Sequence, residues 1–135
     1  MSDIISPIDY AKLRNVIRFG RILSSLIWIY GSLASAPAAN TALASYSVPA
    51  GRQGFIYGYF ISASEANQFE LRWRSGGVSR AIRIVFGGGG TVHAASLVAI
   101  NEGLPADPGT TISIVNVNAG AAGSVYQAGL LIGIP

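Results

Sequence analysis

The sequence predicts a mainly β protein, a sandwich or barrel of seven or eight strands preceded by one long α-helix. The pattern of apolar residues changes near Ala36, from a helical spacing before it to an alternation with period two after about Thr41. The 17 glycines among 135 residues indicate many tight turns, as is typical of domains built from short strands. The predicted organisation is a helix over 1–36, a linker over 37–41 and a β-domain over 42–135.

The predicted helix has a recognisable start and stop. Ser6 is suited to the N-cap, Pro7 to the first helical position and Asp9 to the first turn, and no further proline occurs before Pro37. The first half is amphipathic, with Arg14, Arg18 and Arg21 on one face. The second half, 22–36, carries no charge.

Three interpretations compete for this uncharged stretch: a cleaved export signal, a membrane anchor or an assembly helix. The cap and the arginine face that precede it favour a permanent structural part over a cleaved signal. Fifteen helical residues span about 22 Å, which is less than the ~30 Å hydrocarbon core of a bilayer. We therefore expect helices that pack side by side in an oligomer and contact lipid on the outside, and the pattern leaves open whether they touch lipid or only each other. The predicted membrane or assembly residues are Arg14, Arg18, Arg21, Ile22, Leu23, Leu26, Ile27, Trp28, Ile29, Tyr30 and Leu33.

Seven runs after Thr41 are rich in β-branched, aromatic and alternating residues. They read ALASYSV, GFIYGYFISAS, QFELRWRS, VSRAIRIVF, TVHAASLVAI, TTISIVNVN and SVYQAGLLIGI, and glycine- or proline-containing turns separate most of them. In the third run Phe69, Leu71 and Trp73 alternate with charged residues, as in a half-buried strand. The runs therefore predict an all-β domain.

The composition favours a chain that hides surface in an oligomer or a lipid layer. Only 11% of the residues are charged and the mean hydropathy is +0.46, whereas a soluble domain carries roughly 25% charged residues. The net charge is +3 and no cysteine is present, so disulfides and thiolate metal sites are excluded.

Residues for catalysis are scarce. His93 is the only histidine and is best explained as an ordinary strand residue. Two carboxylate pairs, Glu65 with Glu70 and Glu102 with Asp107, could in principle form a dyad or a calcium site, but solvated loop charges explain them more simply. The FGGGGT segment lacks the lysine and the following helix of a phosphate-binding loop. We therefore expect no enzyme activity, no catalytic or metal site, no cofactor and no small-molecule substrate.

One basic cluster is a candidate for an interface or a polyanion contact. It consists of Arg72, Arg74, Arg80 and Arg83 in RWRSGGVSRAIR, with Trp73 between the first two. Strand alternation places Trp73 on the opposite face from its arginine neighbours, which favours a polar sheet face over a ligand site.

Two segments, SVPAGRQGFIYGYFISAS and INEGLPADPGTTISIVNVN, resemble turns that lead into strands in the small single jelly-roll proteins of viruses. The resemblance covers 45–134 and includes vertex proteins, tail adaptors and fibre heads of membrane-containing viruses. It implies a single jelly roll of seven or eight strands. The helix before the domain looks more like a tail adaptor of a spindle-shaped archaeal virus.

The resemblance implies a structural virion protein. We expect a homo-oligomeric jelly roll that forms a vertex or tail-adaptor ring, with other virion proteins and membrane lipid as partners and passing contact with DNA. The expected location is the envelope-associated vertex or tail of the virion. The alternatives are a subunit of a prokaryotic surface filament, located at the cell surface, and a receptor- or glycan-binding jelly roll with FIYGYF in its contact surface.

Overall fold

The structure, a computed structural model, describes residues 26–87, 93–98 and 103–135, with the backbone alone for 93–98. Within these ranges the chain forms strands joined by turns and loops. The strands are β1 Leu26–Tyr30, β2 Ala34–Ser35, β3 Ala42–Ser47, β4 Gly54–Ala63, β5 Gln68–Ser75, β6 Val78–Val85, β7 His93–Val98, β8 Leu104–Ala106, β9 Thr111–Asn116 and β10 Val125–Gly133.

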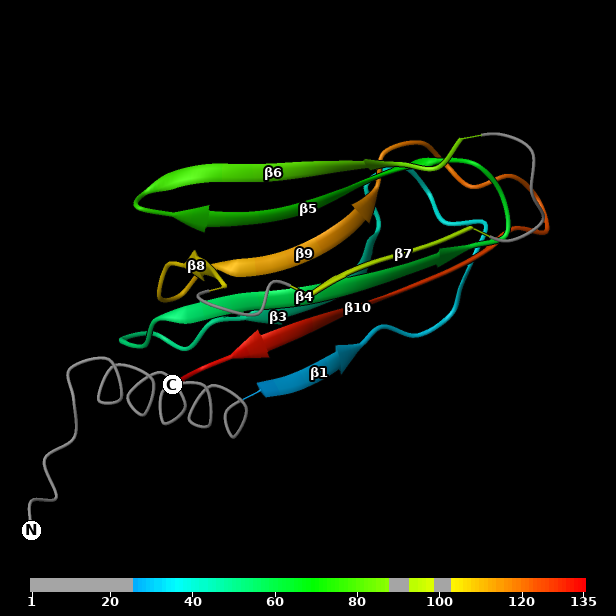
Figure 1. Cartoon of the computed structure of the whole chain (residues 1–135). Helices are drawn as coiled ribbons and strands as arrows, with labels where there is room; N and C mark the ends of the chain where they lie inside the picture. Colours follow the sequence, from blue (N-terminus) through cyan, green and yellow to red (C-terminus); the bar gives the residue numbers. More distant parts are fainter. Residues whose placement is uncertain (1–25, 88–92, 99–102) are drawn as a thin grey trace, which may run out of the picture.

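The strands form two antiparallel sheets that pack as a sandwich (Figure 1). The first sheet, here called the large sheet, has the order β1-β10-β4-β7, with β2 beside β10 and β8 beside β4. The second, the small sheet, has the order β3-β9-β5-β6. The pairs are nested along the chain, β1 with β10, β3 with β9, β4 with β7 and β5 with β6. A long hairpin rolled across two sheets gives this nesting, which confirms a jelly-roll-like sandwich.

The core lies between the sheets and follows the alternation of the strands. Phe69 and Leu71 of β5 face Ile56 and Ile61 of β4 and Leu130 of β10, and all of these side chains are almost completely buried. A buried side chain of this kind contributes about 1.5–3 kcal/mol to folding. Burial of these side chains therefore contributes to holding the two sheets together.

The seven predicted strand runs are confirmed as β3, β4, β5, β6, β7, β9 and β10. Their turns use the residues that the geometry requires. In the Pro49–Arg52 turn and the Asp107–Thr110 turn the third residue is glycine with a positive φ, Gly51 at 80° and Gly109 at 75°. The short strand β8 is not among the predicted runs, because its three residues Leu-Pro-Ala resemble the loop around them.

The predicted helix over 1–36 is wrong from Leu26 onward. Leu26–Tyr30 is strand β1, which pairs with β10 along its whole length, and Ala34–Ser35 is the short strand β2. The residues Leu26, Ile27, Trp28, Ile29, Tyr30 and Leu33 are therefore not part of a helix. Arg14, Arg18, Arg21, Ile22 and Leu23 lie outside the described residues. In the part of the chain that the structure describes, no helix has the length and apolar character needed to span a bilayer.

Leu26–Tyr30 forms a strand rather than a helix because the edge of β10 offers it a partner. Leu26–Tyr30 contains two isoleucines and two aromatic residues, which have a high strand propensity and only a weak helix propensity. The edge of β10 presents unpaired N–H and C=O groups, and β1 satisfies them from Leu26 opposite Gly133 to Tyr30 opposite Gly129. Tertiary pairing thus overrides the helical spacing of the apolar residues.

The predicted linker over 37–41 joins β2 in the large sheet to β3 in the small sheet. The buried Asn116 side chain fixes it, accepting a hydrogen bond from the Thr41 N–H at 3.1 Å and donating one to the Ala38 carbonyl at 2.9 Å. Because β1 and β2 belong to the large sheet, the folded domain includes residues on the N-terminal side of the predicted boundary at 42.

Candidate functional site

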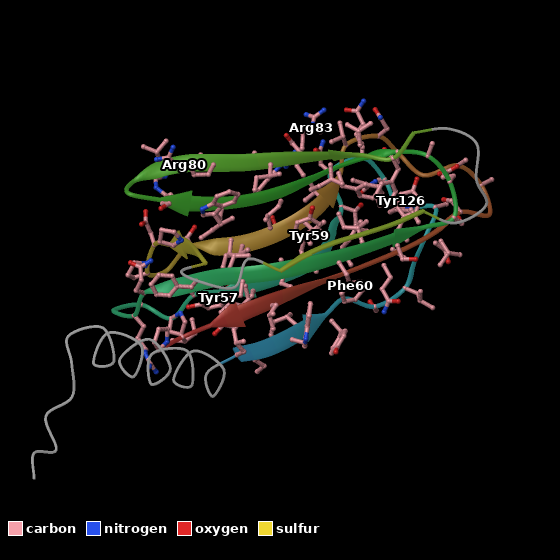
Figure 2. The ribbon with its side chains drawn as sticks, in the orientation of Figure 1. Tyr57, Tyr59, Phe60, Arg80, Arg83 and Tyr126 are labelled. Carbon is pink, nitrogen blue, oxygen red and sulfur yellow. The ribbon has the colours of Figure 1, made fainter. Side chains whose placement is uncertain are left out.

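The outer face of the large sheet is apolar. The ladders place Trp28 beside Leu131 and Tyr30 beside Gly129, and Gly129 beside Phe60, so these residues share the face that points away from the core. Leu26, Phe55 and Tyr57 pack around Leu131 on the same side. We call this set the apolar face; it consists of Leu26, Trp28, Tyr30, Phe55, Tyr57, Phe60 and Leu131 (Figure 2 labels Tyr57 and Phe60).

Three rings make a cluster on the apolar face. The ring centroids of Trp28 and Tyr30 are 6.2 Å apart and each lies 5.9 Å from that of Phe60. Trp28 is 37% exposed and Tyr30 is 67% exposed. The cluster thus presents aromatic surface that the sandwich itself does not cover.

Gly129 makes room for this cluster. A Cβ atom built on Gly129 would lie 2.1 Å from Cε1 of Phe60, which is far closer than two carbon atoms can approach without displacement. The Phe60 ring therefore lies over the backbone of β10, between its own strand β4 and the aromatic rings of β1. Glycine at this position leaves the room that the Phe60 ring occupies.

The outer face of the small sheet is polar. It carries Gln68, Glu70, Arg72 and Arg83, and we call it the polar face. The Glu70 carboxylate binds the Arg72 guanidinium at 2.7 Å and that of Arg83 at 3.1 Å. These two hydrogen bonds, Arg72 first, lower the pKa of Glu70 below its ordinary value. Two of the four arginines of the predicted cluster are thus paired within the chain.

Arg74 and Arg80 lie near the hairpin end of the small sheet but on opposite sides of it. Arg74 is on the polar face, whereas Arg80 is opposite Trp73 on the side of the buried Phe69 and Leu71. Arg74 Nη2 donates to the Gly77 carbonyl at 2.8 Å. Arg80 makes no hydrogen bond and no ion pair with the residues that the structure describes, and it acts on Asp107 only through the field of its charge. An open groove of about 420 Å³ lies at this end of the sheet, and its lining residues are Arg72, Trp73, Arg74, Ser79, Arg80, Ala81, Thr110 and Thr111. The structure therefore divides the predicted cluster: Arg72 and Arg83 bind Glu70, Arg74 binds a backbone carbonyl, and Arg80 binds none of the described residues.

The carboxylates do not form the pairs that the sequence offered. Glu65 accepts hydrogen bonds from the Tyr126 hydroxyl at 2.5 Å and the Ala121 N–H at 2.8 Å, far from the partners of Glu70. Asp107 accepts from the N–H groups of Gly76 and Gly77, both at 2.8 Å, and Glu102 lies outside the described residues. No three acidic or histidine side chains gather as metal ligands within the described ranges, and His93 is described by its backbone alone.

The two segments that resemble viral jelly-roll turns contact each other. The Val48 N–H donates to the Thr110 carbonyl at 2.9 Å, and the Gly109 N–H donates to the Val48 carbonyl at 3.0 Å. The Gln53 side chain also donates to the Ala106 carbonyl. The two turns therefore form one end of the sandwich, where they connect β3 with β4 and β8 with β9.

The sequence analysis named Leu26, Trp28 and Tyr30 as assembly residues of a helix and FIYGYF as an alternative contact surface, but it did not place them together on one face of a sheet. In FIYGYF the alternation suggests a core strand, and Ile56, Tyr59 and Ile61 are indeed buried. A bulge between β4 and β10 next to Tyr57, however, leaves both Tyr57 and Phe55 on the outer side with Phe60. The signal available in the sequence was the number of aromatic residues, which exceeds what one face of a strand can bury.

Comparison with solved structures finds similar folds. The globular domain of the zebrafish complement 1qA protein matches with a TM-score of 0.53 and 8% identity, over 81% of this chain and 95% of that chain. The PRD1 vertex protein P5 matches with a TM-score of 0.43 and 12% identity, over 80% and 96%. The C-terminal domain of A223, a structural protein from Sulfolobus turreted icosahedral virus, gives 0.36 and 15%, over 80% and 96%.

No protein-family model matches the sequence, and no curated protein sequence does. At 8% identity the likeness to the complement domain shows the fold alone. The function has to be argued from the residues of this chain.

Proposed function

We propose that the chain is a structural subunit of a virus particle that assembles with copies of itself through the apolar face. The observation that carries the proposal is the contrast between the two outer sides of the sandwich. The large sheet presents tryptophan, tyrosine and phenylalanine to the outside, whereas the small sheet presents paired arginines and glutamate. Large aromatic residues are enriched in protein interfaces and contribute much of their binding energy.

The scarcity of charge supports a second copy as the occupant of the apolar face. With 11% charged residues the chain has little polar surface to keep such a face soluble alone. A face repeated on every copy is covered by assembly, and closed symmetric oligomers are the usual result. The virion assignment rests on the resemblance of the two contacting turns, SVPAGRQGF and NEGLPADPG, to those of viral jelly rolls.

The experiment compares two variants of the full chain by sedimentation velocity. Trp28→Lys with Tyr30→Lys places two charges on the apolar face, and we expect it to shift the protein from oligomer to monomer. Val85→Lys is the matched control, because Val85 is 61% exposed on the small sheet, and it should leave the oligomer unchanged. Far-ultraviolet circular dichroism checks that both variants keep their β structure.

A monomeric wild-type chain at high concentration would contradict the proposal, as would a double variant that remains an oligomer. Cryo-electron microscopy of the wild-type oligomer tests its finer form, a vertex or tail-adaptor ring. Closed rings of one symmetry support this form, and open irregular aggregates count against it.

We also propose that the assembled subunit contacts membrane lipid, DNA and other virion proteins. Flotation of the full chain with anionic and neutral vesicles tests the lipid contact. A chain that stays at the bottom of the gradient with both vesicle types would contradict the contact with the envelope, but it would not contradict self-assembly.

The aromatic cluster favours a second candidate function, contact with a glycan. Trp28 and Tyr30 lie side by side with only 25° between their ring planes, and sugar rings stack on such surfaces. Binding of a neutral oligosaccharide that Trp28→Ala abolishes, in a chain that stays monomeric, would favour this function over assembly.

A further inference from the structure

We propose that the free edge of strand β1 pairs antiparallel with β1 of a second copy, so that the large sheets of two copies join into one continuous sheet. This inference deepens the proposed assembly and rests on it, because it names the element through which two copies meet. It is carried by the position of β1 in its sheet, by the exposure of apolar side chains on both sides of the strand, and by the fit of the strand to itself.

Strand β1 lies at the edge of the large sheet (Figure 1). It pairs with β10 on one side, and no other described strand pairs with it. The Gly31 N–H donates to the Ala128 carbonyl, which continues the β1–β10 register by one residue. Hydrogen-bonded pairs alternate in an antiparallel ladder, so Ile27 and Ile29 also direct their backbone groups to β10. The residues whose N–H and C=O groups point to the free edge are therefore Leu26, Trp28 and Tyr30.

Apolar side chains are exposed on both sides of β1. Trp28 and Tyr30 lie on the apolar face, whereas Ile29 packs against the core and Ile27 shares its side of the strand. Ile27 is nevertheless 51% exposed. An assembly that covered only the apolar face would leave Ile27 in water, but a strand added at the edge contacts both sides of β1 at once.

The edge of β1 also has no protection against such pairing among its own residues. Soluble proteins guard their free strand edges with charged residues, prolines or bulges. The β1 sequence LIWIY contains no charge and no proline, and its register with β10 runs without a shift from Leu26 to Tyr30. Unprotected edges of this kind are the sites at which a second chain adds a strand.

The sequence of β1 fits a second copy of itself. With Trp28 on a twofold axis, an antiparallel pair places Leu26 opposite Tyr30 of the second copy and Ile27 opposite its Ile29. Every apolar residue then meets an apolar residue, and the apolar faces of the two copies lie on the same side of the joined sheet. No charge on β1 selects an acidic or a basic partner instead.

Strand β6, at the edge of the small sheet, shows the contrast. It carries Arg80 and Arg83, and both are exposed. An antiparallel pair of two β6 strands about their centre would place Arg80 of one copy opposite Arg83 of the other, and like charges in opposite positions are destabilising. Of these two edges, only that of β1 is complementary to itself.

The first test compares Ile27→Lys with Val85→Lys in the full chain by sedimentation velocity. Ile27→Lys places a charge where the second β1 would bury it, and we expect the dissociation constant of the oligomer to rise about tenfold or more. Val85→Lys is the matched control, because Val85 is similarly exposed but lies on the other sheet, and it should leave the oligomer unchanged. Far-ultraviolet circular dichroism checks that both variants are folded.

The second test uses the absence of cysteine from the natural chain. Ile27→Cys and Ile29→Cys are produced separately and also co-expressed. In the proposed register these two positions are a non-hydrogen-bonded pair with Cα atoms about 4.5 Å apart, which a disulfide can bridge. The same position in two copies is a diagonal pair, about 7–8 Å apart, which is too far. A disulfide-linked dimer should therefore form after co-expression but in neither variant alone, as measured by non-reducing electrophoresis.

The outcomes separate the pairing of β1 from the proposed assembly. An oligomer that Trp28→Lys with Tyr30→Lys dissociates, but that Ile27→Lys leaves intact, would overturn the edge pairing and keep assembly through the apolar face. A disulfide that forms equally well in either cysteine variant alone would overturn the proposed register, and so would an oligomer that forms no disulfide after co-expression. A monomeric wild-type chain would overturn both proposals.

Discussion

Gly31 lies where the chain leaving β1 passes over the backbone of β3. Its N–H donates to the Ala128 carbonyl at 2.9 Å, and a Cβ atom at this position would lie 1.8 Å from the Leu43 carbonyl oxygen. Because the obstacle is backbone rather than a mobile side chain, Gly31→Ala should reduce the free energy of unfolding by about 1–3 kcal/mol. Gly87→Ala is the control, since nothing lies within 4 Å of that Cβ. Urea unfolding of both variants measures the difference, and equal stabilities would show that the crossing is not tight.

The hydrogen bonds of Glu65 predict a dependence of stability on pH. Tyr126 first, and then the Ala121 N–H, lower the pKa of the Glu65 carboxyl below its ordinary value of 4.5. A lowered pKa stabilises the fold above 4.5, and this contribution is lost as the pH falls through the folded-state pKa. Glu65→Gln keeps an oxygen acceptor but cannot ionise. We therefore expect the wild type to be more stable than this variant at neutral pH and the difference to shrink as the pH falls below 4.5. A difference that stays constant in urea unfolding over this range would contradict the assignment.

At the scale of the elements, the β5–β6 hairpin depends on a residue from outside the hairpin. Both oxygens of Asp107 accept backbone N–H groups from its turn, Gly76 and Gly77, which have positive φ angles of 60° and 74°. The Asp107→Ala variant should exchange these two amide hydrogens faster with solvent while the amides in the middle of β5 keep their protection. Hydrogen exchange followed by nuclear magnetic resonance measures this. Uniformly faster exchange throughout β5 would mean that Asp107 supports the whole sheet rather than the turn.

The elements also show how far the sequence determines the structure. The strand β5 is predictable from its residues, because Phe69 and Leu71 alternate with Glu70 and Arg72 and the buried side follows directly. The strand β1 is not, because its uncharged residues suit a buried helix and a paired strand equally well, and only the free edge of β10 decides between them. The arginines behave similarly. Their clustering is visible in the sequence, but the choice of Glu70 as the partner of Arg72 and Arg83 depends on the register of β5 and β6.

For the whole molecule, the apolar face predicts how the oligomer responds to salt. Association through the apolar face removes aromatic surface from water and should not weaken when the salt concentration is raised. Sedimentation velocity at low and high sodium chloride measures this response. Dissociation of the oligomer by salt would indicate that charges rather than the apolar face hold it together.

The pairing of β1 with β10 has a consequence for the newly synthesised chain. Leu26 and Gly133 are neighbours in the sheet but lie roughly a hundred residues apart in the sequence. At a synthesis rate of roughly 5–20 residues per second, β1 waits about 5–20 s for its partner strand to be made. During that time its isoleucines and aromatic residues have no sheet to join. The synthesis of β10 is therefore the step that ends the exposure of β1.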